Sequence, residues 1–339
     1  MTNCLGIDVG GANLKFSDGN DRQFSVPFEL WRNRNGLSDS LRHAIRGFGR
    51  SSLVAVTMTG ELCDCFDSKQ DGVRAIVDAV ELACPSSDVR YYQTTGKFVD
   101  KSIAVQSWKL TAASNWHAMG NYAARFLLNQ SGFLIDIGST TTDIVPIVHG
   151  RVVATGKCDL SRMLTGELIY SGVGRSPVSA CLPAVQFRNQ CFPVAQEFFS
   201  STLDVYLLLD HANEEPDNCL TADGRPATKR FAAARMARML CADLEELSTS
   251  EILDFALQVA DAQHKLLLKG LETVLFTHKS IPRQFLVCGQ GEWLAKELVK
   301  QTGSSSQTIA LSTLLSRSAS QVGPAHAVAV LATEEFDNE

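Results

Sequence analysis

Apolar residues in this chain form short runs of strand length and longer stretches with helical spacing. Two segments, Cys4–Phe16 and Phe133–Ile147, share one order: an apolar run containing an aspartate (Asp8, Asp136), a glycine turn with small polar residues, and a second apolar run. This order is typical of a β-hairpin, and glycine lets backbone N–H groups come close to an anion. The sequence therefore predicts two equivalent hairpins that face one phosphate-bearing ligand.

Other apolar patterns predict the remaining elements. Apolar runs predict strands over Leu53–Thr59, Val89–Thr94 and Arg151–Thr155. Helical spacing predicts helices over Gln70–Ala83, Ala112–Leu128, Gln196–Leu208, Ala227–Glu246, Ser250–His278 and Gly323–Phe336. Ser114 or Asn115 is the expected N-cap of the second of these helices. The polar segment Asn213–Thr228 is rich in turn formers and is expected to be a loop or lid.

A third glycine turn lies near the end of the chain. Phe285–Leu298 combines a buried strand, the turn formed by Gly289, Gln290 and Gly291, and an amphipathic helix. Free backbone N–H groups at a helix start, next to glycines, allow a flat group to lie against the backbone. These turn residues are therefore expected to bind a nucleotide or substrate.

The two hairpins supply most of the candidate site. A carboxylate at the position of Asp8 or Asp136 repels phosphate unless a hard cation such as Mg²⁺ lies between them. We expect both residues to be catalytic and to hold Mg²⁺, with an ordinary turn cap as the alternative. Lys15 is expected to contact phosphate, and the alternative is a solvated lysine. Since side chains alternate along a strand, about two hydroxyls of Ser139–Thr142 should face the ligand. The expected phosphate-binding residues are Gly10, Gly11, Asn13, Lys15, Gly138, Ser139, Thr140 and Thr141.

Two carboxylates follow the predicted strand Leu53–Thr59. In an open α/β sheet, the loop after a strand's carboxyl end borders the ligand crevice. Glu61 is therefore expected to be catalytic, as a general base, and Asp64 to contact substrate. The alternative is an acid that interacts with a helix dipole. Asp143 and Glu167 are the next candidates for the base.

Arg175 lies in the glycine-rich segment Ser171–Pro177. A planar guanidinium suits a carboxylate or phosphate. Because the segment is outside both hairpins, Arg175 is a candidate for binding a second substrate, and a purely structural loop is the alternative.

These motifs together resemble those of the actin/hexokinase/Hsp70-type ATPase superfamily. Gly6–Lys15 is similar to its first phosphate motif, Ile135–Asp143 to its second, and Val287–Glu292 to its adenosine motif. Within the superfamily the chain resembles the hydantoinase/oxoprolinase-related group, and more specifically proteins of tetrahydromethanopterin-linked one-carbon metabolism and methanofuran biosynthesis. The segments that carry this closer resemblance are Val56–Phe66, Ala112–Ala118, Gly166–Val178 and Thr221–Thr228.

The resemblance implies an α/β fold with two ribonuclease-H-like domains around a central cleft. It implies a first domain over 1–132 that includes a returning C-terminal helix, about 323–336, and a second domain over 133–322 with helical insertions. The implied activity joins an aminomethylfuran-methyl diphosphate to the phenol oxygen of a tyramine derivative such as γ-glutamyltyramine, with Mg²⁺ as cofactor and release of diphosphate.

Two other functions stay open at this point. The same three motifs, taken at superfamily level, predict an ATP-dependent small-molecule kinase or a hydantoinase/oxoprolinase-like hydrolase. A non-catalytic, nucleotide-gated partner protein is a third alternative. The chain contains no P-loop segment, which argues against a P-loop enzyme. It also contains no G-x-S-x-G elbow, which argues against an esterase.

The charge, the lengths of the apolar runs and the cysteine spacing limit the classes of protein to which this chain can belong. The chain has 339 residues and a net charge of −6, which argues against non-specific nucleic-acid binding. No apolar run approaches the roughly 20 residues of a membrane span, and no signal peptide is evident, so a cytoplasmic protein is expected. The ten cysteines lack paired C-x-x-C spacing and are expected to be reduced thiols. The expected partners are a phosphorylated small molecule and a tyramine-type acceptor, and a homodimer is compatible with the sequence.

Overall fold

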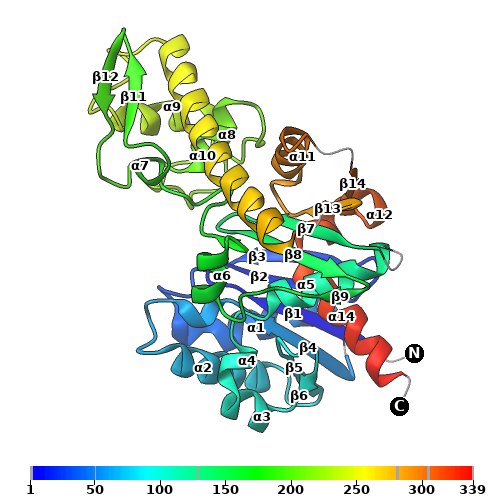
Figure 1. Cartoon of the computed structure of the whole chain (residues 1–339). Helices are drawn as coiled ribbons and strands as arrows, with labels where there is room; N and C mark the ends of the chain where they lie inside the picture. Colours follow the sequence, from blue (N-terminus) through cyan, green and yellow to red (C-terminus); the bar gives the residue numbers. More distant parts are fainter. Residues whose placement is uncertain (1–2, 50, 128–129, 280–281, 304–305, 338–339) are drawn as a thin grey trace.

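The computed structural model describes residues 3–49, 51–127, 130–279, 282–303 and 306–337. Two mixed sheets form its framework (Figure 1). The first sheet has six strands in the order β3-β2-β1-β4-β5-β6, with β1, β4 and β5 parallel. Its strands are β1 (Cys4–Val9), β2 (Asn13–Ser17), β3 (Gln23–Pro27), β4 (Leu53–Met58), β5 (Asp88–Tyr92) and β6 (Phe98–Val99).

The second sheet repeats this plan. Its order is β10-β8-β7-β13-β14, β9 also pairs with β8, and β7, β13 and β14 are parallel. Its strands are β7 (Gly132–Ile137), β8 (Thr142–Val148), β9 (Arg151–Val152), β10 (Leu168–Ile169), β13 (Gln284–Cys288) and β14 (Gln307–Ala310). In each sheet the first strand thus pairs with an antiparallel hairpin partner on one side and with a parallel strand on the other.

The two predicted hairpins are confirmed, and they share one register. Asp8 on β1 pairs directly with Lys15 on β2, and Asp136 on β7 pairs directly with Asp143 on β8. The first strand of each hairpin, β1 or β7, is apolar and buried at nearly every position, as expected for the centre of an α/β sheet. The polar residues of the two turns lie beyond the ends of these strands, at the same end of each sheet.

Helices cover the first sheet on both faces. These helices are α1 (Leu37–Arg46), α2 (Lys69–Ala83), α3 (Lys101–Gln106), α4 (Trp108–Thr111), α5 (Asn115–Ala123) and α14 (Gly323–Phe336). The last of them comes from the far end of the chain and packs on β1. The contact is close, since a β-carbon at Gly6 would lie 2.0 Å from the carbonyl oxygen of Ala325. The predicted C-terminal helix is confirmed.

The rest of the second half extends away from its sheet along the long helix α10 (Figure 1). This helix spans Thr249–His278 and begins with a capping box in which Ser248 and Glu251 bond to each other's backbone N–H groups. The other elements of this half are α6 (Asp159–Thr165), α7 (Val178–Cys181), β11 (Ala184–Phe187), β12 (Gln190–Pro193), α8 (Thr202–Leu208), α9 (Lys229–Arg238), α11 (Glu292–Gln301), α12 (Leu311–Leu314) and α13 (Arg317–Gln321). Short 3₁₀ turns occupy Arg34–Gly36, Gly60–Leu62 and Ala124–Leu127.

Several predicted boundaries are wrong. The helix predicted over Gln196–Leu208 begins only at Thr202, because Ser201 and Asp204 form a capping box there. The helix predicted over Ala227–Glu246 ends at Arg238, shortly before Cys241, whose φ of +55° is left-handed.

Two other predicted elements are shorter than expected. The helix predicted over Ala112–Leu128 begins at Asn115, after Ala113 with its left-handed φ of +46°. Ser114 occupies the N-cap position but makes no capping bond, because its hydroxyl lies 2.8 Å from that of Thr57. Leu128 lies outside the described residues. The strand predicted over Arg151–Thr155 covers only Arg151–Val152. Across the described ranges, no helix is long and apolar enough to cross a membrane.

Candidate functional site

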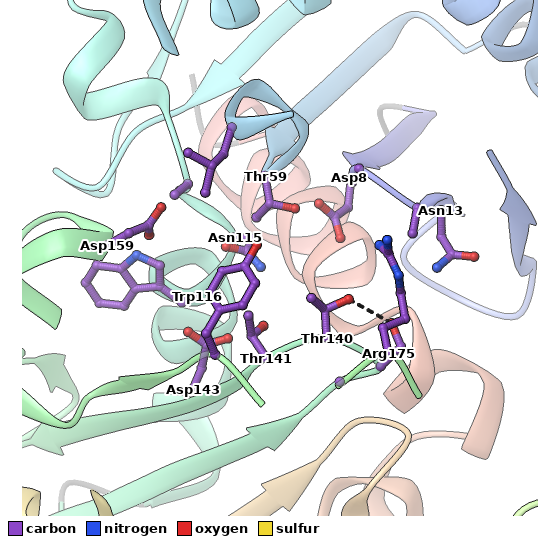
Figure 2. A pocket seen from close by; sticks show the side chains of 18 of the residues that line it. Asp8, Asn13, Thr59, Asn115, Trp116, Thr140, Thr141, Asp143, Asp159 and Arg175 are labelled. Atoms are coloured by element: carbon purple, nitrogen blue, oxygen red, sulfur yellow. Dashed lines mark hydrogen bonds between the residues drawn. The ribbon is translucent and has the colours of Figure 1, made fainter. Parts of the chain in front are cut away.

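A cavity of about 420 Å³ lies where the ends of the two hairpins meet. Figure 2 shows Asp8 and Thr59 on one side of it and Thr140 and Thr141 on the other. The first half of the chain supplies Asp8, Gly10, Gly11, Ala12, Asn13, Lys15, Trp31, Thr59, Leu62, Cys63, Asp64, Ala113, Asn115 and Trp116. The second half supplies Gly138, Ser139, Thr140, Thr141, Asp143, Asp159, Arg162, Leu168, Tyr170 and Arg175.

The first hairpin brings its predicted residues to this cavity. Gly10 donates its N–H to the carbonyl of Asn13 at 3.0 Å, which closes the turn. A β-carbon at Gly10 would lie 2.8 Å from that same carbonyl oxygen, and one at Gly11 would lie 2.9 Å from Cys63 Sγ. Only glycine fits here without displacement, so the backbone of the turn stays exposed to the cavity.

Asp8 and Lys15 form an ion pair inside the cavity. Lys15 Nζ lies 3.3 Å from Asp8 Oδ2, with side-chain exposures of 27% and 3%. Burial raises the pKa of Asp8, and attraction to Lys15 offsets part of that rise. Burial alone would lower the pKa of Lys15, but Asp8 and then Asp136 raise it above its ordinary value. Lys15 is therefore a cation at neutral pH, held close to the turn of the first hairpin.

The second hairpin has the same turn geometry. Gly138 donates its N–H to the carbonyl of Thr141 at 2.9 Å. Ser139, Thr140 and Thr141 line the cavity, one residue more than strict alternation predicts. Thr142 points away, because its buried hydroxyl donates to the carbonyl of Ser171 at 2.8 Å.

The two aspartates of the second hairpin differ in position. Asp143 lines the cavity, whereas Asp136 is not part of the lining. The Asp136 carboxylate lies instead against the next turn, since a β-carbon at Gly289 would be 2.3 Å from Asp136 Oδ1. Burial and repulsion from Asp143 raise the pKa of Asp136 to about 6. Asp143, which the sequence suggested only as an alternative general base, is thus the aspartate of this hairpin that faces the cavity.

Arg175 reaches the cavity from a loop that packs on the second hairpin. The N–H groups of Gly174 and Arg175 both donate to the carbonyl of Ser139, at 2.9 and 2.8 Å. The exposed guanidinium lies over the ring of Trp31, 4.5 Å from its centroid. Within the described ranges it has no carboxylate partner, and Figure 2 shows it between Asn13 and Thr140. This position is next to the phosphate hairpins, which favours contact with a phosphate over contact with a separate second substrate.

The two acids after β4 are separated by the cavity wall. Asp64 is exposed and lines the cavity, but Glu61 is 1% exposed and does not. The buried Glu61 carboxylate makes no side-chain hydrogen bond among the described residues. Burial raises the pKa of Glu61 to about 7, against the opposing effect of nearby backbone N–H groups. Glu167, a reserve candidate, accepts bonds from the N–H groups of Thr155 and Gly156 at 2.6 and 2.7 Å and lies off the cavity.

The third glycine turn lies behind the second hairpin. Gly291 donates its N–H to the carbonyl of Ile137 at 2.8 Å, and Gly289 has a left-handed φ of +88°. Neither glycine lines the cavity, and Gln290 is exposed to solvent. Close packing against Ile137 explains why both positions are glycine, since a β-carbon at either would lie within 2.5 Å of that residue. The expected role of this turn in binding a nucleotide or substrate remains a prediction.

Several residues that line the cavity were not predicted from the sequence to belong to the site. Trp116 and Arg162 are both buried, with the guanidinium 4.0 Å from the centroid of the indole ring. Asp159 lies at the start of α6, and its ion pair of 3.1 Å with Lys69 joins the two halves of the chain. Trp116 lies in Ala112–Ala118, one of the segments that carried the family resemblance. This resemblance was the sequence feature that could have indicated Trp116 as a site residue.

The donor set is compatible with Mg²⁺. Among the residues that the structure describes, no group of three or more histidine, cysteine, aspartate or glutamate side chains is arranged to hold a metal ion. Mg²⁺ does not need one, since it keeps several waters and takes one or two carboxylates together with phosphate oxygens. Asp8 Oδ1 is buried on the cavity wall without a hydrogen-bond partner, as a cation ligand would be. Asp8 therefore fits the proposed role, and the part assigned to Asp136 stays a prediction.

Comparison with known proteins identifies the class. Residues 52–331 match the family model described as hydantoinase/oxoprolinase, and the chain belongs to that family. A structure of acetone carboxylase without nucleotide superimposes with a TM-score of 0.59 at 12% identity, covering 96% of this chain and 70% of that one. This likeness, together with the two matching sheets, confirms the predicted α/β fold of two ribonuclease-H-like, actin-like halves around a cleft.

Two archaeal relatives are more similar in sequence. The protein from Methanocaldococcus jannaschii named (4-{4-[2-(gamma-L-glutamylamino)ethyl]phenoxymethyl}furan-2-yl)methanamine synthase is 32% identical over 338 residues, 98% of each chain. A protein of the same name from Methanococcus vannielii is 31% identical over 212 residues, 62% of this chain and 94% of its own. Both relatives are named as synthases of a furan-methanamine that carries a phenoxymethyl group, which supports an enzymatic function for this chain.

Proposed function

We propose that this protein is a transferase that forms the ether bond between a furan and a phenol in methanofuran-type cofactor biosynthesis. The observation that carries the proposal is the 32% identity over 98% of both chains to a synthase whose product name contains a phenoxymethylfuran. The cavity between two glycine turns supports it, because such turns suit a substrate that carries a diphosphate.

The proposed reaction is a substitution at the methylene carbon of an aminomethylfuran-methyl diphosphate. The phenol oxygen of a tyramine derivative, such as γ-glutamyltyramine, gives up its proton to a carboxylate and donates an electron pair to that carbon. The bond from the carbon to the diphosphate oxygen breaks, and its electron pair leaves with the diphosphate. The electron-rich furan ring stabilises the positive charge that develops on the carbon. The products are the ether, diphosphate and one proton.

The hairpin residues are proposed to hold the leaving diphosphate. Lys15 and Arg175 are cations on the cavity wall, and Ser139, Thr140 and Thr141 supply hydroxyl donors. Donors fixed before the reaction stabilise the charge that appears on a leaving group without a cost of reorganisation. Bound Mg²⁺ would neutralise diphosphate charge, held by Asp8 and, in this proposal, Asp136.

Glu61 is the proposed general base. Its pKa of about 7 suits proton transfer at neutral pH. Since Glu61 is buried and does not line the cavity, direct proton transfer requires that the cavity wall moves when substrate binds. Asp64, on the same loop and already in the cavity, is the competing candidate.

The direct test supplies the purified protein with the furan diphosphate, γ-glutamyltyramine and Mg²⁺. We expect the ether product and diphosphate in equal amounts. Calorimetry with ATP distinguishes the proposed transferase from the alternative function. An ATP-dependent kinase or hydrolase binds ATP tightly, whereas the proposed transferase does not need it. Tight ATP binding without ether formation would replace the proposal with that alternative.

A further inference from the structure

The cavity has two chemically different ends. Asp8, Asn13 and Arg175 gather at the end formed by the first hairpin (Figure 2). Trp116 and Asp159 lie on the opposite side (Figure 2). Leu62, Leu168 and Tyr170 add apolar and aromatic side chains to the lining, and burial together with the nearby charge of Asp159 raises the pKa of Tyr170. One end thus suits phosphate and the other suits an aromatic ring.

Trp116 carries a buried donor without a partner. The residue is 4% exposed and lines the cavity, and its buried Nε1 makes no hydrogen bond to the described residues. An indole N–H can only donate, and a buried one usually finds an acceptor. An unpaired donor on a cavity wall therefore points to an acceptor atom supplied by a ligand.

Arg162 fixes this ring in place. Its guanidinium lies 4.0 Å from the centroid of the Trp116 ring. It donates to Asp143 Oδ1 at 2.7 Å and to the carbonyl of Glu167 at 2.9 Å, and the whole side chain is 0% exposed. A cation held over the face of an indole draws electron density from the ring and makes the N–H a stronger donor. The arrangement orients and polarises one N–H group.

The surroundings of this donor select among possible ligands. A phosphate finds its glycine turns and cations at the other end of the cavity. A carboxylate would meet the acids Asp143 and Asp159 of the lining, and the fully buried Arg162 already donates to Asp143 and to the carbonyl of Glu167. A phenol places its flat ring against Leu62 and Tyr170, which are 45% and 54% exposed, and offers one oxygen.

We propose that this end of the cavity is the acceptor subsite, in which Trp116 donates its indole N–H to the phenol oxygen and Arg162 positions Trp116. The inference rests on the proposed function and adds to it. The donor binds a phenolate more strongly than a phenol. Because Asp143 and Asp159 of the lining are each paired with a cation, Arg162 and Lys69, the subsite favours loss of the phenol proton and prepares the oxygen for attack. Trp116 is then a catalytic residue and Arg162 a positioning residue.

The test measures phenolate formation without any ether chemistry. We use 4-nitrophenol as the probe, because its phenolate absorbs visible light, and titrate its absorbance with pH in the presence of full-length protein. The wild-type protein should make the bound probe more acidic. Trp116→Phe keeps a ring for Arg162 to stack on but removes the N–H, and should reduce the preference for phenolate by roughly 10- to 100-fold, the effect of one hydrogen bond to a charged group.

Two further variants give the controls. Trp31→Phe makes the same chemical change at the phosphate end and should leave the acidity of the bound probe unchanged. Arg162→Lys keeps a charge beside Asp143 but loses planar stacking, and should give a phenolate preference between those of wild type and Trp116→Phe. Circular dichroism checks that each variant folds.

The possible results separate this inference from the proposed function. Equal phenolate preference in wild type and Trp116→Phe, or no preference in wild type, overturns the inference even where ether forms. A preference that depends on Trp116 supports it, including in a protein that makes no ether, which would mean that the phenol site is real and the proposed reaction is wrong. Loss of the preference in Trp31→Phe as well would show a general effect of the cavity and overturn the assignment to Trp116.

Discussion

Asp8 and Lys15 are direct partners across the first hairpin, and their charged atoms lie 3.3 Å apart. At the same register the second hairpin pairs Asp136 with Asp143, two acids. One hairpin is therefore close to neutral at its end, whereas the other carries two acids, of which Asp143 is paired with Arg162 from α6. The pair of hairpins suits a ligand that combines an anion with a cation, such as a diphosphate with Mg²⁺.

The first prediction concerns Asp8 and Asp136. Asp8→Asn and Asp136→Asn should each lower turnover by on the order of 10²–10³, because each removes a charge proposed to hold the cation beside the leaving group. Activity as a function of Mg²⁺ concentration, together with circular dichroism, checks this. Near-normal turnover in the Asp8 variant would count heavily against the proposed cation site between the hairpins. Reduced stability with unchanged Mg²⁺ dependence in the Asp136 variant would assign Asp136 a purely structural role.

The second prediction concerns Lys15. Lys15→Met should weaken binding of inorganic diphosphate, and added salt should reduce the difference between the variant and the wild-type protein, since salt screens the lost attraction. Titration calorimetry at low and high salt measures both effects. Lys109→Met, whose side chain lies away from the cavity over Trp108, is the matched control and should bind diphosphate as wild type does. Equal diphosphate affinity in the two variants would place Lys15 outside the binding site.

The hairpins could be predicted from sequence because their signal is local. An apolar run, an aspartate and a glycine turn determine a strand and a turn within a dozen residues, and both hairpins formed as expected. Trp116 and Arg162 could not be paired in this way, since their contact joins α5 to α6 through tertiary packing. Likewise, the sequence placed Glu61 correctly after a strand, but a loop's position does not tell which of its side chains faces the cavity.

The third prediction separates packing from ligand binding at the last glycine turn. Gly289→Ala should destabilise the protein by roughly 1–3 kcal/mol, because alanine is strained at a φ of +88° and its β-carbon meets the Asp136 carboxylate. Gln290→Ala, at an exposed position next to it, should change stability by no more than about 0.5 kcal/mol. Urea denaturation measures both. If Gln290→Ala instead abolishes nucleotide binding by a stable protein, the turn is a nucleotide site as its sequence suggested.

The fourth prediction concerns Glu61 as the base. Glu61→Gln should lower turnover by on the order of 10²–10⁴ with little change in substrate affinity, because the amide keeps the shape but cannot take a proton. The loss should shrink for phenols of lower pKa, which need less help to ionise. Asp64→Asn on the same loop is the matched comparison. A large loss that depends on the acceptor in the Asp64 variant alone would exchange the two roles, and no such loss in either would move the base elsewhere, with Asp143 next.

The last prediction follows from the burial of the same carboxylate. The pKa of Glu61 is raised from 4.5 to about 7 in the folded protein, so between these values the native state binds more protons than the unfolded state. Stability contributed by the protonated form is complete below pH 4.5 and is lost as the pH rises through about 7. Over that interval the wild-type protein should lose about 3 kcal/mol through this group.

Glu61→Gln carries no titrating group at this position and should escape that loss. Urea denaturation at pH 5 and pH 8 should therefore show that the free energy of unfolding of the variant increases relative to that of the wild-type protein as the pH rises. This is expected although the variant is the less active of the two proteins. The difference between the two pH values isolates Glu61 because every other titrating group is shared by both proteins. A stability difference that does not change with pH would mean that the carboxylate is hydrated in solution, and the buried base would have to be abandoned.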